Sequence, residues 1–89
     1  MIIFQKTSRY QRERSKFVKN SSSRTNALIK TLKIFVYNPN HPSLHLEKLG
    51  GSKLWTVRID KSNRIFFFLV EEKTALLIDI RQHDKYRRY

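Results

Sequence analysis

The chain has 89 residues, enough for one domain over residues 1–89 with a modest hydrophobic core. It contains no cysteine, which excludes a disulfide framework, a thiolate metal site and a cysteine nucleophile. Nineteen Lys and Arg against seven Asp and Glu give a net charge of +12, which is typical of proteins that bind polyanions such as nucleic acids.

The first half of the chain predicts a strand followed by two helices. The apolar first four residues favour a short strand, and Thr7 or Ser8 can cap a helix that runs to about Lys19. After a polar turn, apolar residues at helical spacing predict a second helix over about residues 24–37. Pro39 ends this helix, because the residue before a proline avoids helical angles. The short turn between the helices predicts an antiparallel hairpin.

The second half of the chain changes to the period of β-strands. LWTVRID and TALLIDIRQH alternate apolar and polar residues, whereas RIFFFLV is apolar on both faces, as in a central strand. The short turns KSN and EEK between them predict an antiparallel three-strand meander. The expected fold class is therefore α+β: an N-terminal strand, a two-helix antiparallel hairpin and then the meander.

The alternation also assigns the strand residues to the two faces of the sheet. Three apolar residues of the last strand share one face, which we expect the helices to cover: Leu76, Ile78 and Ile80. The residues between and after them share the other face: Leu77, Asp79, Arg81 and His83. That second face should be an open binding surface, and it carries four basic side chains: Arg58, Arg64, Arg81 and His83.

Four motifs occur in this order: a LEKLGG turn, a WTVRI strand, an NRIFF strand start and an IRQH strand end. In combination they resemble the RelE-like toxins of bacterial type II toxin–antitoxin systems, nearest the YoeB and HigB branch. The resemblance implies an endoribonuclease that cleaves messenger RNA at the ribosomal A site. It also implies an acidic antitoxin that wraps the toxin in a hetero-oligomer.

RNA cleavage of this metal-independent kind uses the 2′-hydroxyl as nucleophile. It needs a base, cations for the phosphate and an acid for the leaving oxygen. Histidine suits the acid or base, and the arginine fork suits the phosphate. The resemblance implies that Arg64 contacts the scissile phosphate and that His83 is the general acid, with Arg81 beside it as a phosphate or substrate contact. The general base is either His45 or Glu47, since both stand near the glutamate base of the YoeB branch.

Three further side chains on the second face have alternative roles. Arg58 either clamps a phosphate or pairs with the carboxylate of Asp60 or Asp79. Phe66 and Phe68 share a face with Arg64, so they belong either to the core or to a platform on which bases stack.

Lys48, Lys53 and Tyr86 complete the candidate RNA-binding residues. The two lysines strengthen the basic field, with direct RNA contact as the alternative, and Tyr86 can stack on a base. The YoeB branch has a tyrosine directly after the histidine, whereas this chain has Asp84 there.

The remaining features concern cofactors, location and rival functions. Three scattered histidines show no ligand spacing, and no phosphate-binding or dinucleotide motif occurs, so we expect no metal and no cofactor. The start lacks a secretion signal and the apolar runs are too short for a membrane span, so we expect a cytoplasmic protein. Two other functions stay open: a ParE-like toxin that poisons gyrase without nuclease activity, and a non-catalytic basic RNA-binding module.

Overall fold

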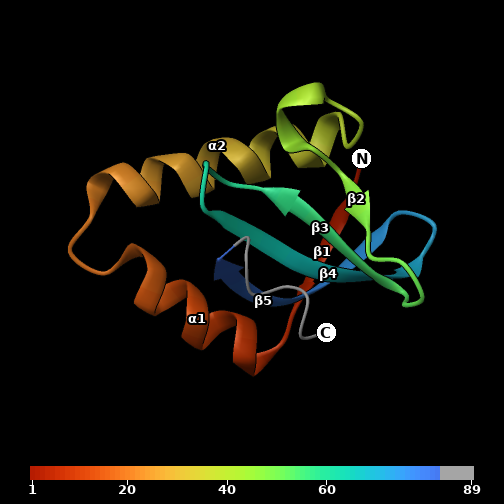
Figure 1. Cartoon of the computed structure of the whole chain (residues 1–89), viewed down its shortest axis with the longest axis horizontal. Coiled ribbons are helices and arrows are strands. Elements are labelled where there is room, and N and C mark those ends of the chain that lie inside the picture. The colour runs from red at the N-terminus through yellow and green to blue at the C-terminus, as the bar shows by residue number, and fades with distance from the viewer. Residues whose placement is uncertain (83–89) are drawn as a thin grey trace.

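The computed structural model of the chain describes residues 1–82 (Figure 1). Its elements follow in the order β1 (Ile3–Lys6), α1 (Ser8–Val18), α2 (Ser22–Tyr37), the 3-10 helix η1 (Pro42–Leu44), β2 (Glu47–Lys48), β3 (Leu54–Arg58), β4 (Asn63–Glu71) and β5 (Thr74–Gln82). The predicted strand, helix pair and antiparallel meander are confirmed. Neither helix in the described part has the length and apolar character needed to cross a membrane.

The strands form one five-stranded sheet in the order β1-β5-β4-β3-β2. The first strand, β1, lies parallel to the last, β5, with Ile3 in register with Thr74, and the other pairs are antiparallel. The short β2 forms the other edge of the sheet beside β3. Gly51, in the turn between β2 and β3, has a φ of 76°, a conformation that favours glycine.

Both α-helices have a hydroxyl side chain as their N-terminal cap. The Thr7 side chain accepts a hydrogen bond from the Tyr10 backbone nitrogen at 3.1 Å, and its hydroxyl donates to the Leu77 carbonyl at 3.0 Å. Thr7 therefore caps α1 and also ties it to β5. Ser21 caps α2 by accepting from the Arg24 nitrogen at 3.1 Å, so this helix begins earlier than the apolar spacing predicted.

The core lies between the helix pair and one face of the sheet. The helices contribute four of its members: Tyr10, Phe17, Leu28 and Phe35. The sheet contributes six more: Val57, Ile65, Phe67, Ala75, Leu77 and Ile80. The Phe35 ring stands at the centre, with its centroid 5.5 Å from that of Phe4 and 5.0 Å from that of Phe67.

A β-bulge changes the phase of β5. The register of β4 and β5 shifts at Ile78, which is left without a partner residue on β4. Leu77 and Ile80 consequently both lie in the core. Leu76, opposite Phe68, lies on the other face instead. The strict alternation predicted for this strand was therefore wrong at Leu76 and Leu77, because one extra residue reverses the faces on one side of it.

The second face of the sheet is not the open surface that the sequence predicted. The residues in the middle of this face are buried. Thr56 is 1% exposed, and Phe66 and Asp79 are both 0% exposed. Phe66 is thus a buried residue and offers no stacking platform, whereas Phe68 is half-buried. Half-buried residues of this face lie at both ends of the strands, the arginines at one end and Phe68 and Leu76 at the other.

Tyr10 carries a hydroxyl that is buried in the core and has no hydrogen-bond partner among the described residues. Burial raises the pKa of Tyr10 above its usual 10.0, and the charge of Arg14 lowers it by less. The folded chain therefore holds this proton more tightly than the unfolded chain. The stability that depends on the proton is complete below about pH 10 and is lost as the pH rises through the folded pKa.

We expect Tyr10→Phe to leave the free energy of unfolding unchanged at neutral pH or to raise it by about 1 kcal/mol, since no buried hydrogen bond is lost. The decline of that free energy above about pH 10 should also be smaller than in the unaltered chain. Urea denaturation at neutral and alkaline pH measures both effects. A clear destabilisation at neutral pH would show that the hydroxyl has a partner.

Candidate nucleic-acid interface

Three arginines lie side by side at one end of the sheet. Arg58 on β3 is in register with Arg64 on β4, which is in register with Arg81 on β5. Residues directly opposite each other in antiparallel strands share a face, with their Cβ atoms about 4.5–5.5 Å apart. All three side chains are half-buried. We call Arg58, Arg64 and Arg81 the arginine row.

The arginine row concentrates positive charge. Like charges directly opposite each other on neighbouring strands destabilise a sheet, and guanidinium groups do not lose their protons in proteins. The Asp79 carboxylate, 2.6 Å from Arg81 Nε, compensates part of this charge, and an anion bound across the row reduces the repulsion further. The planar fork of arginine matches the oxygen pairs of phosphate, so the row is a candidate phosphate site.

The turn between β3 and β4 sets the register of the row. The Asp60 carboxylate accepts hydrogen bonds from the backbone nitrogens of Ser62 and Asn63, both at 2.9 Å. The Ile59 nitrogen donates to the Asn63 carbonyl, also at 2.9 Å. This closed turn returns the chain so that the first residue after Asn63 lies opposite the last residue of β3.

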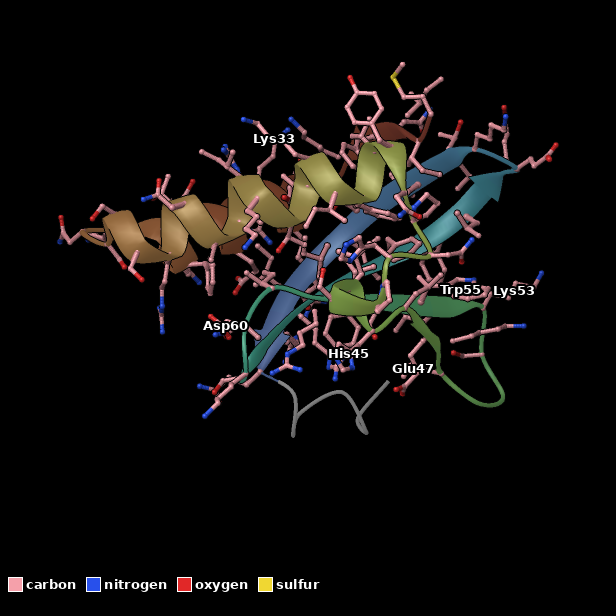
Figure 2. The ribbon with its side chains drawn as sticks, turned by 90° about the horizontal axis from the view of Figure 1, so that it is seen from above. Lys33, His45, Glu47, Lys53, Trp55 and Asp60 are labelled. Carbon is pink, nitrogen blue, oxygen red and sulfur yellow. The ribbon has the colours of Figure 1, made fainter. Side chains whose placement is uncertain are left out.

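His45 lies against the β3 end of the arginine row. It follows η1 in a left-handed conformation with φ 46°, and its Nε2 lies 3.2 Å from Arg58 Nη1. Figure 2 shows it on the side of the sheet away from α2. Because a guanidinium group only donates, Nε2 is the acceptor in this hydrogen bond.

The remaining contact of Arg58 bears on one of its two predicted alternatives, the pairing with a carboxylate. Its Nε donates to the Asp60 backbone carbonyl at 3.1 Å. No ion pair joins it to the carboxylate of Asp60 or Asp79 within residues 1–82. Arg58 is therefore held by a carbonyl and by His45, and the predicted pairing with a carboxylate is wrong.

The other candidates on β2 and β3 fall in different places. Glu47 is exposed and opposite Thr56, so it shares the face of the arginine row. Lys48 is opposite Trp55 and therefore lies on the helix-covered side. Lys53 precedes β3 at the end away from the row, about 17 Å along an extended chain. Figure 2 shows Lys53 pointing outward at that end. Of these three residues, only Glu47 lies on the face that carries the arginine row.

Three of the residues singled out in the sequence, His83, Asp84 and Tyr86, lie outside the described residues. Among residues 1–82, no three His, Asp or Glu side chains converge closely enough to bind a metal ion.

The structure adds one residue that sequence reasoning did not assign to the site. Arg9, in the first turn of α1, places its Nη2 3.1 Å from the Asp79 carboxylate. The same carboxylate oxygen lies 2.6 Å from Nε of Arg81 in the row. The only sequence signal was the predicted cap of α1, which put Arg9 in the first turn without indicating which strand it would reach.

No protein-family model matches the chain, and no curated protein matches its sequence. Solved structures do match. A metal-bound toxin from Helicobacter pylori superposes with a TM-score of 0.75 at 14% identity, over 97% of this chain and 99% of that chain. A YoeB/ParE toxin from Agrobacterium tumefaciens gives 0.74 at 14% identity, over 92% and 99%. This chain has the fold of the RelE/ParE toxins.

The RelE/ParE fold extends over nearly the whole chain. The YoeB-YefM complex from Staphylococcus aureus provides a further match, with a TM-score of 0.71 at 15% identity over 93% of this chain and 98% of the other. The fold that the four sequence motifs predicted is therefore confirmed. At these identities the likeness concerns the path of the chain, so the chemistry has to be argued from the residues of this chain itself.

Proposed function

We propose that this chain is the toxin of a type II toxin–antitoxin pair and that it cleaves messenger RNA at the ribosomal A site as a metal-independent endoribonuclease. The observation that carries the proposal is the arginine row with His45 hydrogen-bonded to its β3 end. The RelE/ParE fold supports a toxin. A net charge of +12 suits a polyanionic substrate.

In the proposed reaction, the 2′-oxygen of one nucleotide attacks the adjacent phosphorus while the bond to the 5′-oxygen of the next nucleotide breaks. The arginine row stabilises the negative charge that builds up on the phosphate oxygens. His45 is the proposed base: its Nε2 exchanges the hydrogen bond from Arg58 for one from the 2′-hydroxyl when Arg58 turns to the phosphate, and it then takes that proton. Glu47 is the alternative base. His83, the residue after β5, is the proposed acid that protonates the leaving oxygen.

Three further residues are proposed to bind RNA away from the scissile phosphate. Lys48 and Lys53 lie on another face and at another end from the arginine row, so we assign them to flanking parts of the RNA. Tyr86 is proposed to stack on a base.

The proposed partner is an acidic antitoxin that forms a hetero-oligomer with this chain in the cytoplasm. Structures with the same fold include the YoeB-YefM and DinJ-YafQ complexes. On α2 of this chain, Ile29 is 46% and Tyr37 is 76% exposed, next to Lys33. Apolar side chains beside a lysine suit an amphipathic acidic segment, so we expect the antitoxin to contact the helix pair.

The test is to induce the chain in bacteria and to map the ends of messenger RNA. We expect new 5′ ends inside translated regions, carrying a 5′-hydroxyl opposite a 2′,3′-cyclic phosphate, because the 2′-oxygen is the nucleophile. Purified chain should give the same ends on ribosome-bound messenger RNA. Intact messenger RNA with gyrase-linked DNA breaks would instead indicate a ParE-like poison. RNA binding without cleavage or DNA breaks would indicate a plain RNA-binding module.

Two variants serve as internal controls in the purified assay and separate the candidate bases. His45→Gln should lower the cleavage rate by about 10²-fold or more, which is typical of losing a general base. Glu47→Gln should cleave at close to the unaltered rate. The opposite result would assign the base to Glu47, and equal cleavage by all three proteins would point to a contaminating nuclease.

A further inference from the structure

Asp79 is a buried carboxylate at the edge of the arginine row. It is 0% exposed. Its Oδ1 accepts a hydrogen bond from the Ile80 backbone nitrogen at 2.9 Å. Its Oδ2 lies 2.6 Å from Arg81 Nε and 3.1 Å from Arg9 Nη2. A buried charge is tolerated where it is paired and hydrogen-bonded, and here cations from two different elements meet on one oxygen.

The position of the first turn of α1 brings Arg9 close to this carboxylate. The Thr7 nitrogen and hydroxyl both bond the Leu77 carbonyl, at 3.1 and 3.0 Å. This anchor lies directly before the bulge at Ile78. The bulge then places Asp79 on the second face, opposite Phe66, where the first turn of α1 can reach it. The contact therefore depends on the cap and on the bulge together.

We propose that Asp79 is a positioning residue that aims Arg81 at the phosphate, with Arg9 completing its charge balance. This rests on the proposed function, in which the arginine row binds the scissile phosphate. Asp79 and Arg81 stand two residues apart on one face of β5, and Arg81 faces Arg64 across the strands. Because the short bond uses Nε, it fixes the plane of the Arg81 guanidinium group beside Arg64.

The rival explanation is that Asp79 merely neutralises charge. The two explanations predict different results for Asp79→Asn, which keeps the shape and removes the charge. If Asp79 only neutralises, the variant binds RNA more tightly and cleaves at least as fast. If Asp79 positions Arg81, the variant binds RNA as tightly or more tightly, since net positive charge rises, yet cleaves more slowly.

The direct measurement is the Nε–Hε signal of Arg81 by NMR in the free protein. In the unaltered chain we expect a shifted, slowly exchanging signal, and in Asp79→Asn we expect it to move to the position of exposed arginines. Glu72→Gln is the matched control, because it removes one acidic charge in the turn at the other end of β5. It should leave the Arg81 signal unchanged. An unchanged Arg81 signal in Asp79→Asn overturns the proposal.

The kinetic measurement separates positioning from loss of fold. In Asp79→Asn we expect the cleavage rate at saturating ribosome-bound messenger RNA to fall by about 10-fold or more. Affinity for the same RNA with a 2′-deoxy scissile nucleotide should be unchanged or higher. A misfolded protein would lose both, whereas an unchanged rate overturns the proposal. Should the unaltered chain cleave no RNA, the proposed function fails, and the Arg81 signal still tests the inference.

Arg9 provides a second variant should Asp79→Asn not fold. Arg9 has a side chain that is 48% exposed, so Arg9→Gln opens no buried cavity. We expect Arg9→Gln to shift the Arg81 signal and to lower the cleavage rate by a smaller factor than Asp79→Asn. Arg9→Lys, which restores the positive charge, should recover part of both. With Asp79→Asn unfolded, an Arg9→Gln protein that matches the unaltered chain in both measurements overturns the proposal.

Discussion

Arg64→Ala is expected to lower the rate of messenger RNA cleavage by about 10²–10³-fold, the usual effect of removing one donor that stabilises transition-state charge. Arg64 occupies the centre of the arginine row, with Arg58 opposite it on one strand and Arg81 on the other. A phosphate bound across the row must therefore meet Arg64, whichever neighbour it also contacts.

The effect should arise in the chemical step and not from unfolding. Arg64 is the second residue of β4 and is half-buried, so we expect the free energy of unfolding to change by no more than about 1 kcal/mol. Urea denaturation of the same preparation checks this. Arg64→Lys keeps the charge but loses the planar fork, and its rate should fall between those of the other two proteins.

Lys73→Ala is the matched control for Arg64→Ala. It removes the same single charge from an exposed position in the turn between β4 and β5, at the other end of the sheet from the arginine row. Its cleavage rate should stay within a few fold of the unaltered chain, because only the general field changes. Equal losses in both variants would mean that total charge, and not the row, drives cleavage. No loss in Arg64→Ala would remove the row from the mechanism.

Phe35→Ala is expected to lower the free energy of unfolding by about 3–5 kcal/mol. The side chain is 1% exposed, and its ring contacts Phe4 on β1 and Phe67 on β4. Truncation would therefore leave a cavity where α2 meets the edge and the centre of the sheet at once. Since small domains are stable by about 5–15 kcal/mol in total, this one change removes a large share.

Urea denaturation measures this loss, and Tyr37→Ala is its control on the same helix. Tyr37 is also aromatic but 76% exposed, so its removal should change the free energy of unfolding by no more than about 0.5 kcal/mol. A loss below about 1 kcal/mol for Phe35→Ala would contradict its central place in the core.

The sequence by itself determined the first strand, the two helices, the three-strand meander and their order, but not η1 or the short edge strand β2. Local signals are sufficient for this: apolar spacing for α2, a hydroxyl cap for α1, and short turns that force antiparallel pairing in the meander. It also placed Arg58 and Arg64 on either side of one tight turn, so their closeness follows from the hairpin. The fold class and the centre of the candidate site were therefore predictable.

Other features depended on contacts between residues far apart in the chain. The parallel pairing of β1 with β5 joins the two ends of the described chain, and no local pattern indicates it. The faces of Leu76 and Leu77 depended on the bulge at Ile78, because one unpaired residue reverses every side chain on one side of it. Strand register also explains why Lys48 lies away from the arginine row: the pairing of the short β2 with β3 places Lys48 on the helix-covered face.

The contact between Arg9 and Asp79 shows most clearly what only the tertiary structure decided. The two residues are 70 positions apart in the sequence. The local sequence indicates only a basic residue on the surface of a helix and an acidic residue in a strand. They meet because the cap of α1 bonds β5 just before its bulge. Local sequence determines which dihedral angles a segment prefers, but which side chains meet is set by strand register and by where helices dock.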